Sequence, residues 1–189
     1  MDSVAVYCGS AAGRSEAYAQ AARHLGEELA RRGLTLVYGG GDVGLMGIVA
    51  DACLAAGGHV IGVIPQQLVD VELSHQNITQ LEVVDTMAQR KSRMEELADA
   101  FVCLPGGVGT LEELTEVLTM QQLGNIEGPV GLVDVQGFWQ PFVHMYSAMV
   151  QEGFVQQRFL DALVVESTPV AVLEAFGAWS NPGSKWGNN

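Results

Sequence analysis

Short apolar runs alternate with stretches of helical period along the whole chain. Ser3 to Cys8 is apolar at nearly every position, as in a buried strand. Between Tyr18 and Leu29 apolar side chains recur at spacings of four, three and four, which predicts a helix capped by Ser15 and reaching Arg32. The same criteria predict further strands at 34–38, 59–64, 80–85, 100–104, 130–133 and 163–165. They predict further helices from the glycines at 39–41 to about 56, at 86–98, 110–123 and 139–152, and from 168, with 65–77 as the longest loop.

The predicted strands are apolar throughout instead of alternating, which is typical of a parallel sheet covered on both faces. Strands alternating with helices then predict an α/β fold: a single-domain, Rossmann-like, doubly wound parallel sheet. We expect one nucleotide-binding domain over 1–180 and a flexible tail over 181–189.

Composition and charge narrow the range of partners. The 189 residues are 48% hydrophobic and carry a net charge of −13, so we expect no nucleic-acid partner and no membrane partner. Three scattered cysteines do not suggest a disulfide framework, and the start of the chain lacks a signal-peptide pattern. We therefore expect a soluble, cytoplasmic protein.

Glycines and small polar residues follow three of the predicted strands. They are Gly9 and Ser10, the run Gly39–Gly41, and Pro105–Thr110 with the sequence PGGVGT. In doubly wound sheets ligands lie outside the carboxyl ends of the strands, and free N–H groups at a helix N-terminus attract phosphate. The alternative is a turn that needs left-handed residues.

Two common nucleotide motifs do not fit the chain. Gly39, Gly41 and Gly44 match GxGxxG, but they follow the second predicted strand and no acidic residue occurs about 20 positions further on to bind a ribose. The P-loop pattern is absent from the sequence. Neither NAD nor a P-loop nucleotide is expected, and no cofactor is predicted.

One basic cluster stands out between Arg32 and Arg158, consisting of Arg90, Lys91 and Arg93. Lys91 can pair with Glu95 on a solvated helix face. Arg90, in contrast, shares the apolar stripe of its predicted helix, where a charge needs an anionic partner. That partner can be an internal carboxylate or a ligand.

The acidic residues after the third glycine-rich turn allow two interpretations. Thr110 and Glu113 have the spacing of a capping box. A carboxylate beside a phosphate site and a guanidinium is also what cleavage of a nucleotide's glycosidic bond requires, because positive charge develops on the sugar. The four histidines have no ligand spacing, so no metal site is predicted.

The segments YGGGDVGLMG, QRKSRM and LPGGVGTLEELTEVLT resemble the Lonely Guy family of cytokinin riboside 5′-monophosphate phosphoribohydrolases, long mislabelled as lysine decarboxylases. The resemblance runs from Cys8 to about Phe154. It implies hydrolysis of an N6-modified AMP to the free base and ribose 5-phosphate, with no metal or redox cofactor, by a homodimer. It implies Arg90 and Glu113 as the catalytic pair. Together with the strand-end residues, the expected substrate-binding set is Ser10, Gly40, Gly41, Glu72, Lys91, Gly107, Val108, Gly109, Thr110, Leu111, Glu112 and Thr119.

Two details bear on that resemblance. Many members have a histidine two positions before the catalytic arginine, where this chain has Ala88. Lys91 is the sole lysine before Lys185, so a pyridoxal phosphate Schiff base in this domain would have to use it, and no partner for the pyridine nitrogen is identifiable.

Two other functions remain open on the sequence. One is an AMP nucleosidase-like hydrolase without preference for an N6 substituent. The other is a non-catalytic carrier of a nucleotide or a pterin phosphate on the same fold.

Overall fold

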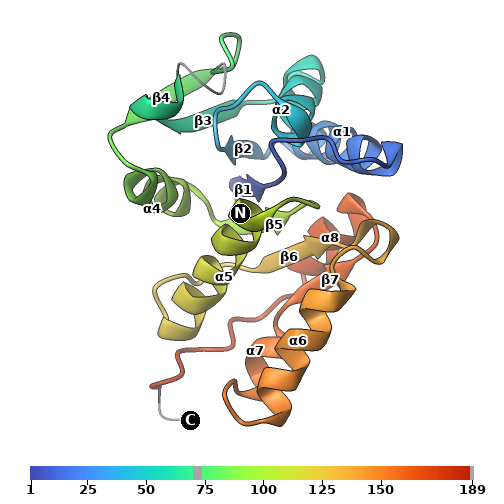
Figure 1. The fold of residues 1–189 in the computed structure, drawn as a ribbon, viewed down its shortest axis with the longest axis vertical. Coiled ribbons are helices and arrows are strands. Elements are labelled where there is room, and N and C mark those ends of the chain that lie inside the picture. Colours follow the sequence, from blue (N-terminus) through green and yellow to red (C-terminus); the bar gives the residue numbers. More distant parts are fainter. Residues whose placement is uncertain (70–73, 188–189) are drawn as a thin grey trace.

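A computed structural model describes residues 1–69 and 74–187 of the chain. Within them the chain forms a seven-stranded, all-parallel sheet in the order β4-β3-β2-β1-β5-β6-β7 (Figure 1). The strands are β1 (Ser3–Tyr7), β2 (Thr35–Tyr38), β3 (Val60–Pro65), β4 (Gln80–Val84), β5 (Ala100–Cys103), β6 (Val130–Val133) and β7 (Val164–Glu166). The strand order reverses direction between β1 and β5, so the predicted doubly wound fold is confirmed, with its switch point at these two strands.

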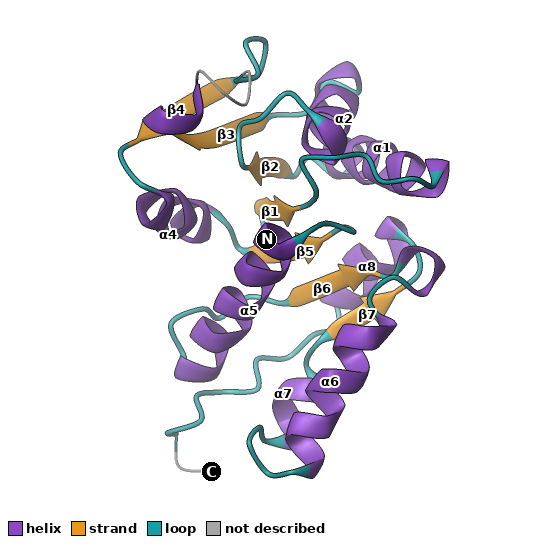
Figure 2. Ribbon diagram, in the orientation of Figure 1, coloured by secondary structure: helices purple, strands orange, loops and turns teal. Residues whose placement is uncertain are grey.

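Helices cover both faces of this sheet (Figure 2). The longer ones are α1 (Glu16–Arg31), α2 (Gly44–Ala55), α4 (Met87–Leu97), α5 (Val108–Leu123), α6 (Gln140–Gln151) and α8 (Pro169–Phe176). The short ones are α3 (Gln66–Val69), η1 (Val135–Gly137) and α7 (Gln157–Asp161). Helices α1, α2 and α8 pack on one face, and α4, α5 and α6 pack on the other.

The central strands show why the apolar runs are continuous. In β1, Val4 and Val6 face the core under α1 and α2, while Ala5 and Tyr7 face the core under α4 and α5. All four are at most 2% exposed. A strand buried on both faces has no solvent side, so it shows no alternation of polar residues.

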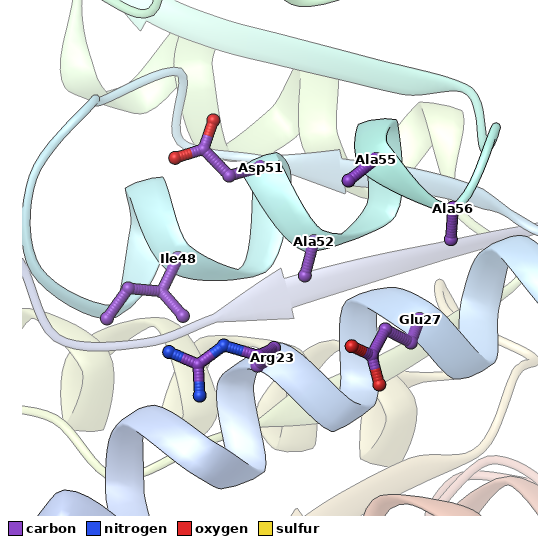
Figure 3. Close-up of a pocket in the computed structure, with 7 residues that line it drawn as sticks. All are labelled: Arg23, Glu27, Ile48, Asp51, Ala52, Ala55 and Ala56. Carbon is purple, nitrogen blue, oxygen red and sulfur yellow. The ribbon is translucent and has the colours of Figure 1, made fainter.

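Helices α1 and α2 approach each other closely at Gly26. A Cβ there would lie 2.4 Å from the Val49 carbonyl oxygen, so a larger residue would push the helices apart. Figure 3 shows the surface pocket between them, with a volume of about 460 Å³. Its lining consists of Arg23, Glu27, Ile48, Asp51, Ala52, Ala55 and Ala56.

The helix ends largely follow the sequence signals. Ser15 accepts a hydrogen bond from the Ala17 N–H before α1, as predicted. Thr86 and Gln89 form a capping box at the start of α4. The predicted loop over 65–77 includes the end of β3 and the short helix α3, and its residues 70–73 lie outside the described part.

The expected tail contacts the end of α5. The Lys185 N–H donates to the Gln122 carbonyl over 2.8 Å, and the Ser184 hydroxyl donates to the Leu123 carbonyl. Arg158 also donates to the Ser184 carbonyl over 2.9 Å. The flexibility of 181–189 stays a prediction. None of the helices in the described residues is long and apolar enough to cross a membrane.

Candidate active site

A cavity of about 340 Å³ lies at the carboxyl ends of β1, β2 and β5, where the strand order reverses. Chain segments that are far apart in sequence contribute to it, namely the loops after β1, β2 and β5 together with α2, α3, α4 and α5. Its lining consists of Val6, Tyr7, Cys8, Gly9, Ser10, Gly39, Met46, Leu68, Met87, Arg90, Met94, Gly107, Val108, Gly109, Thr110, Glu112 and Glu113. This is the position that the fold predicts for a ligand.

The guanidinium of Arg90 is fixed by main-chain atoms. Its Nε donates to the Val63 carbonyl over 3.1 Å, and its Nη2 donates to the Gly39 carbonyl over 3.0 Å. The residue is only 6% exposed, as its place in the apolar stripe of α4 predicts. The third nitrogen, Nη1, lies 3.9 Å from Oε1 of Glu113. Arg90 therefore has an internal carboxylate partner and also lines the cavity.

Glu113 presents a largely buried carboxylate to the same space, with 12% of its side chain exposed. Burial raises the pKa of this carboxyl to about 7, although the charge of Arg90 favours its ionised form. At 3.9 Å the two side chains interact through charge and not through a hydrogen bond. The site thus holds a carboxylate poised to titrate near neutral pH beside a permanent positive charge.

Helix α5 begins earlier than the sequence predicted. Its first residue is Val108, with Gly107 as N-cap, and its first helical hydrogen bond runs from the Leu111 N–H to the Gly107 carbonyl. The N–H groups of Val108, Gly109 and Thr110 therefore precede the helical ladder and lie at the cavity. The start of α5 has the features of an anion site.

Of the two interpretations of Thr110 and Glu113, the capping box is wrong, because the N-cap of α5 is Gly107. Thr110 is the third residue of α5 and is only 4% exposed. Its side chain packs against Gly106, where an added Cβ would lie 2.1 Å from the Thr110 hydroxyl. Glu113 is therefore not a capping residue, and its carboxylate is available to the cavity.

Lys91 does not pair with Glu95, in contrast to the surface interpretation of the sequence. Its ammonium contacts the carboxylate of Glu112 and lies 2.7 Å from Oε2 of Glu116, both on α5. The Lys91 side chain is 15% exposed. The lysine links α4 to α5 beside the cavity, without belonging to the cavity lining.

The structure brings together Arg90, Glu113 and half of the twelve expected binding residues, namely Ser10, Gly107, Val108, Gly109, Thr110 and Glu112. Five others lie outside this lining, namely Gly40, Gly41, Lys91, Leu111 and Thr119. Leu111 lines a neighbouring apolar cavity with Trp139 and Phe142. Thr119 is exposed and donates to the Thr115 carbonyl, while Gly41 forms a bridge to Ser74. Glu72 lies outside the described residues.

Some lining residues had no signal in the sequence. Met46, Leu68 and Met87 come from three different helices and add an apolar part to the cavity. Each resembles an ordinary packing residue in its own segment. Gly39 belongs to the glycine run that its strand-end position indicated, but its contact with Arg90 had no signal: a Cβ there would lie 1.7 Å from Nη2 of Arg90.

Ala88, at the position of the family's histidine, faces away from this cavity. It is exposed and lines a separate groove along β4 together with Val83 and Ser92. Since β4 is an edge strand, residue 88 belongs to the surface of that edge and is not part of the lining that holds Arg90 and Glu113.

Within the described residues, Asp42, Asp51 and His75 form a group that sequence spacing did not reveal, with their ligand atoms within 4.8 Å of one another. The Nδ1 atom of His75 accepts from the Asn77 N–H, so Nε2 carries the proton and lies 3.0 Å from Asp51. The imidazole is thus engaged on both nitrogens, and a metal would have to displace that proton.

The fold and this cavity define a class: Rossmann-like α/β proteins with an anion-binding helix N-terminus beside a buried Arg–Glu pair. A family model described as "Possible lysine decarboxylase" matches residues 46–176. The chain is 50% identical over 154 residues to the cytokinin riboside 5′-monophosphate phosphoribohydrolase LOG of Oryza sativa subsp. japonica, covering 82% of this chain and 64% of that protein. It is 46% identical over 152 residues to LOG1 of Arabidopsis thaliana, which carries the same activity in its name, covering 80% and 71%. The chain belongs to the Lonely Guy family.

A solved structure extends the likeness of the fold. The molybdenum cofactor carrier protein of Chlamydomonas reinhardtii superimposes with a TM-score of 0.71 at 18% identity, covering 93% of this chain and 96% of that chain. At this identity the comparison supports the doubly wound architecture alone.

Proposed function

We propose that this protein hydrolyses the N-glycosidic bond of N6-modified AMP, releasing a free cytokinin base and ribose 5-phosphate. The observation that carries the proposal is the buried carboxylate of Glu113, 3.9 Å from the guanidinium of Arg90, in a cavity that also receives the N-terminus of α5. The names of the relatives at 50% and 46% identity support the same reaction.

The N-terminus of α5 is the proposed site for the 5′-phosphate. Unbonded N–H groups and the positive end of the helix dipole favour a doubly charged anion there. This local donor set offsets the net charge of −13, which would otherwise repel a nucleotide. Glu113 follows Thr110 by about one turn, so a sugar attached to that phosphate extends toward the carboxylate.

The apolar part of the cavity is the proposed site for the base. Leu68 and Met87 line this part of the cavity. Both are uncharged, and both come from chain segments other than the glycine-rich start of α5. A purine with an apolar N6 substituent can bury surface against such side chains. The two kinds of lining thus match the two ends of the substrate.

The chemistry follows from the charges. As the bond between C1′ and N9 breaks, its electron pair leaves with the base and positive charge develops on the ribose ring. The ionised Glu113 stabilises that charge and orients a water molecule, whose oxygen bonds to C1′. One proton of the water passes to the base. Arg90 holds a permanent charge and cannot donate a proton, so it positions Glu113 and the anionic oxygens.

Lysine decarboxylation does not fit this site. A pyridoxal phosphate enzyme needs a lysine that can form a Schiff base facing the cavity. Lys91 is held by the carboxylates of Glu112 and Glu116 and lies outside the cavity lining.

A hydrolysis panel tests the proposal. Purified protein is incubated with AMP, N6-isopentenyl-AMP, GMP and the corresponding nucleosides, and the released base is measured by chromatography. We expect release from N6-isopentenyl-AMP and little from its unphosphorylated nucleoside. Equal rates on AMP would instead support a nucleosidase without N6 preference. Absence of any product together with a retained ligand would support a carrier.

We also propose a homodimer, as in the family that the chain belongs to. Exposed apolar side chains beside the cavity support it, among them Val108, which is 84% exposed, and Met145, which is 46% exposed. Light scattering coupled to size-exclusion chromatography tests this: a mass near twice 20.1 kDa is expected, and a monomer at all concentrations would contradict it.

A further inference from the structure

Lys91 forms an ionic junction between two helices of the candidate active site. Its ammonium comes from α4 and reaches two carboxylates one turn apart on α5, those of Glu112 and Glu116. The three side chains are 15%, 54% and 30% exposed, so the junction is partly shielded from solvent. Shielding of this kind makes an ion pair stronger than one on an open surface.

The junction joins the sequence neighbours of the proposed catalytic pair. Lys91 directly follows Arg90, and Glu112 directly precedes Glu113. Consecutive helical residues point about 100° apart, so Lys91 lies beside the cavity that Arg90 faces, and Glu112, which also lines the cavity, meets it there. Any change in the spacing of α4 and α5 at this junction therefore changes the 3.9 Å separation of Arg90 and Glu113.

The junction also sets the charge around Glu113. Arg90 and Lys91 favour the ionised form of its carboxyl, whereas burial, Glu112 and Glu116 oppose it. The groups facing it from β5, from β1 and from the residue after β1 do not add charge at neutral pH, because burial raises the pKa values of Tyr7, Cys8 and Cys103 above their ordinary values. Without the lysine, two acids would act on Glu113 with only Arg90 to balance them.

We propose that Lys91 is a positioning residue: it joins α4 to α5 through Glu112 and Glu116, and so sets the distance and the charge balance between Arg90 and Glu113 without contacting the substrate. This inference rests on the proposed function, in which Glu113 acts as an ionised carboxylate. It assigns the lysine a role different from the substrate contact that the resemblance implies.

The test compares Lys91→Met, which keeps the length of the side chain but removes its charge, with Lys91→Arg, which keeps the charge. Hydrolysis of N6-isopentenyl-AMP is measured from pH 5 to 9. For Lys91→Met we expect the acidic limb of the rate profile to move up by about one pH unit, with about fivefold lower kcat at pH 7 and KM within about twofold of the original protein. Lys91→Arg should restore the profile. A tenfold rise in KM with an unmoved limb would show a direct substrate contact and overturn the proposal.

A second measurement does not depend on activity. The carboxyl carbon of Glu113 is followed by NMR in ¹³C-labelled protein without nucleotide, and its signal is assigned with Glu113→Gln. Lys91→Met should raise the titration midpoint of Glu113, and an unchanged midpoint would contradict the proposal. If the original protein hydrolyses no nucleotide, the proposed function fails while this titration still decides the role of Lys91.

A further variant covers the case in which Lys91→Met does not fold. In Glu112→Gln/Glu116→Gln the ammonium of Lys91 remains while both opposing acids are removed. The titration midpoint of Glu113 should then move downward, and a midpoint that stays in place or rises would overturn the charge coupling proposed here.

Discussion

Nη2 of Arg90 occupies the space that a side chain at position 39 would need. A Cβ on Gly39 would lie 1.7 Å from that nitrogen and 2.8 Å from the guanidinium carbon. The same nitrogen donates to the carbonyl of Gly39, so the glycine both admits and binds the arginine. Residue 39 is therefore part of the site although it has no side chain.

Gly39→Ala should displace the guanidinium and lower activity strongly. Arg90 would lose a main-chain acceptor and its alignment with Glu113, and we expect kcat/KM to fall about 100-fold, the size of effect seen when a charge-stabilising donor is lost. Steady-state hydrolysis of N6-isopentenyl-AMP measures this. Gly177→Ala is the matched control, because it lies exposed at the end of α8 with ordinary helical backbone angles. Full activity in Gly39→Ala would show that Arg90 does not need its observed position.

Glu113→Gln should abolish turnover while leaving the fold intact. The amide matches the shape of the carboxyl but cannot balance positive charge on the sugar, so we expect kcat to fall about 1,000-fold. Rates are compared with circular dichroism spectra. Glu127→Gln serves as control, since it makes the same change beyond the far end of α5, whose last residue lies about 15 Å along the helix from Glu113. A Gln variant that turns over normally would remove Glu113 from the mechanism.

We predict that ionisation of the Glu113 carboxyl has opposite effects on activity and on stability as the pH rises. Burial raises its pKa to about 7, so the ionised, active form is lost as pH falls through 7. The folded protein binds this proton more tightly than the unfolded chain, so the group's contribution to stability falls as pH rises from about 4.3 to about 7.

Thermal denaturation of Glu113→Gln checks the stability half of this prediction. The variant should have a higher Tm than the original protein at pH 8, where the original protein holds a buried charge. The difference should shrink at pH 5, where both proteins carry a neutral group. A variant that is less stable at pH 8 would show that the Glu113 charge contributes to folding.

The contribution of Glu28 to stability should depend on pH in the opposite sense to that of Glu113. On α1 it accepts hydrogen bonds from Arg31 and Arg32, each at 2.6 Å, and the bond from Arg31 above all lowers its pKa to about 2. Its contribution to stability is present above the unfolded pKa of about 4.3 and is lost as pH falls toward 2.

Glu28→Gln should therefore lower Tm by about 3 °C at pH 7 and by less at pH 3. Glu27→Gln changes the adjacent, exposed residue of the same helix and is the control. Differential scanning calorimetry at both pH values measures the effect. Equal losses for the two variants would contradict a special role for the Glu28 pairs.

The sequence was informative where a single segment carries the whole signal. Continuous apolar runs such as Ser3–Tyr7 indicated buried strands, because a strand covered on both faces must be apolar on both. Arg90 was predicted to be buried because it shares its helical face with Met94, and the structure confirms this burial.

The features of the site that the sequence did not predict depend on contacts between segments that are distant along the chain. The acceptors of Arg90 are carbonyls at positions 39 and 63, which have no side-chain signature. The spacing allows Lys91 to pair with Glu95 on its own helix, but tertiary packing offers it two carboxylates from α5 instead. The start of α5 was misplaced because the spacing of Thr110 and Glu113 imitates a capping box, while the packing of Thr110 against Gly106 decides the geometry.

The anchoring of Arg90 by carbonyl oxygens has an evolutionary consequence. A carbonyl is present whatever residue occupies its position, so substitutions along β3 can accumulate without releasing the guanidinium, whereas position 39 tolerates none. Side chains such as Leu68 and Met87 are free of this restriction. New substrate preferences can therefore arise in descendants of this gene by exchange of those two residues, while the charged centre is inherited intact.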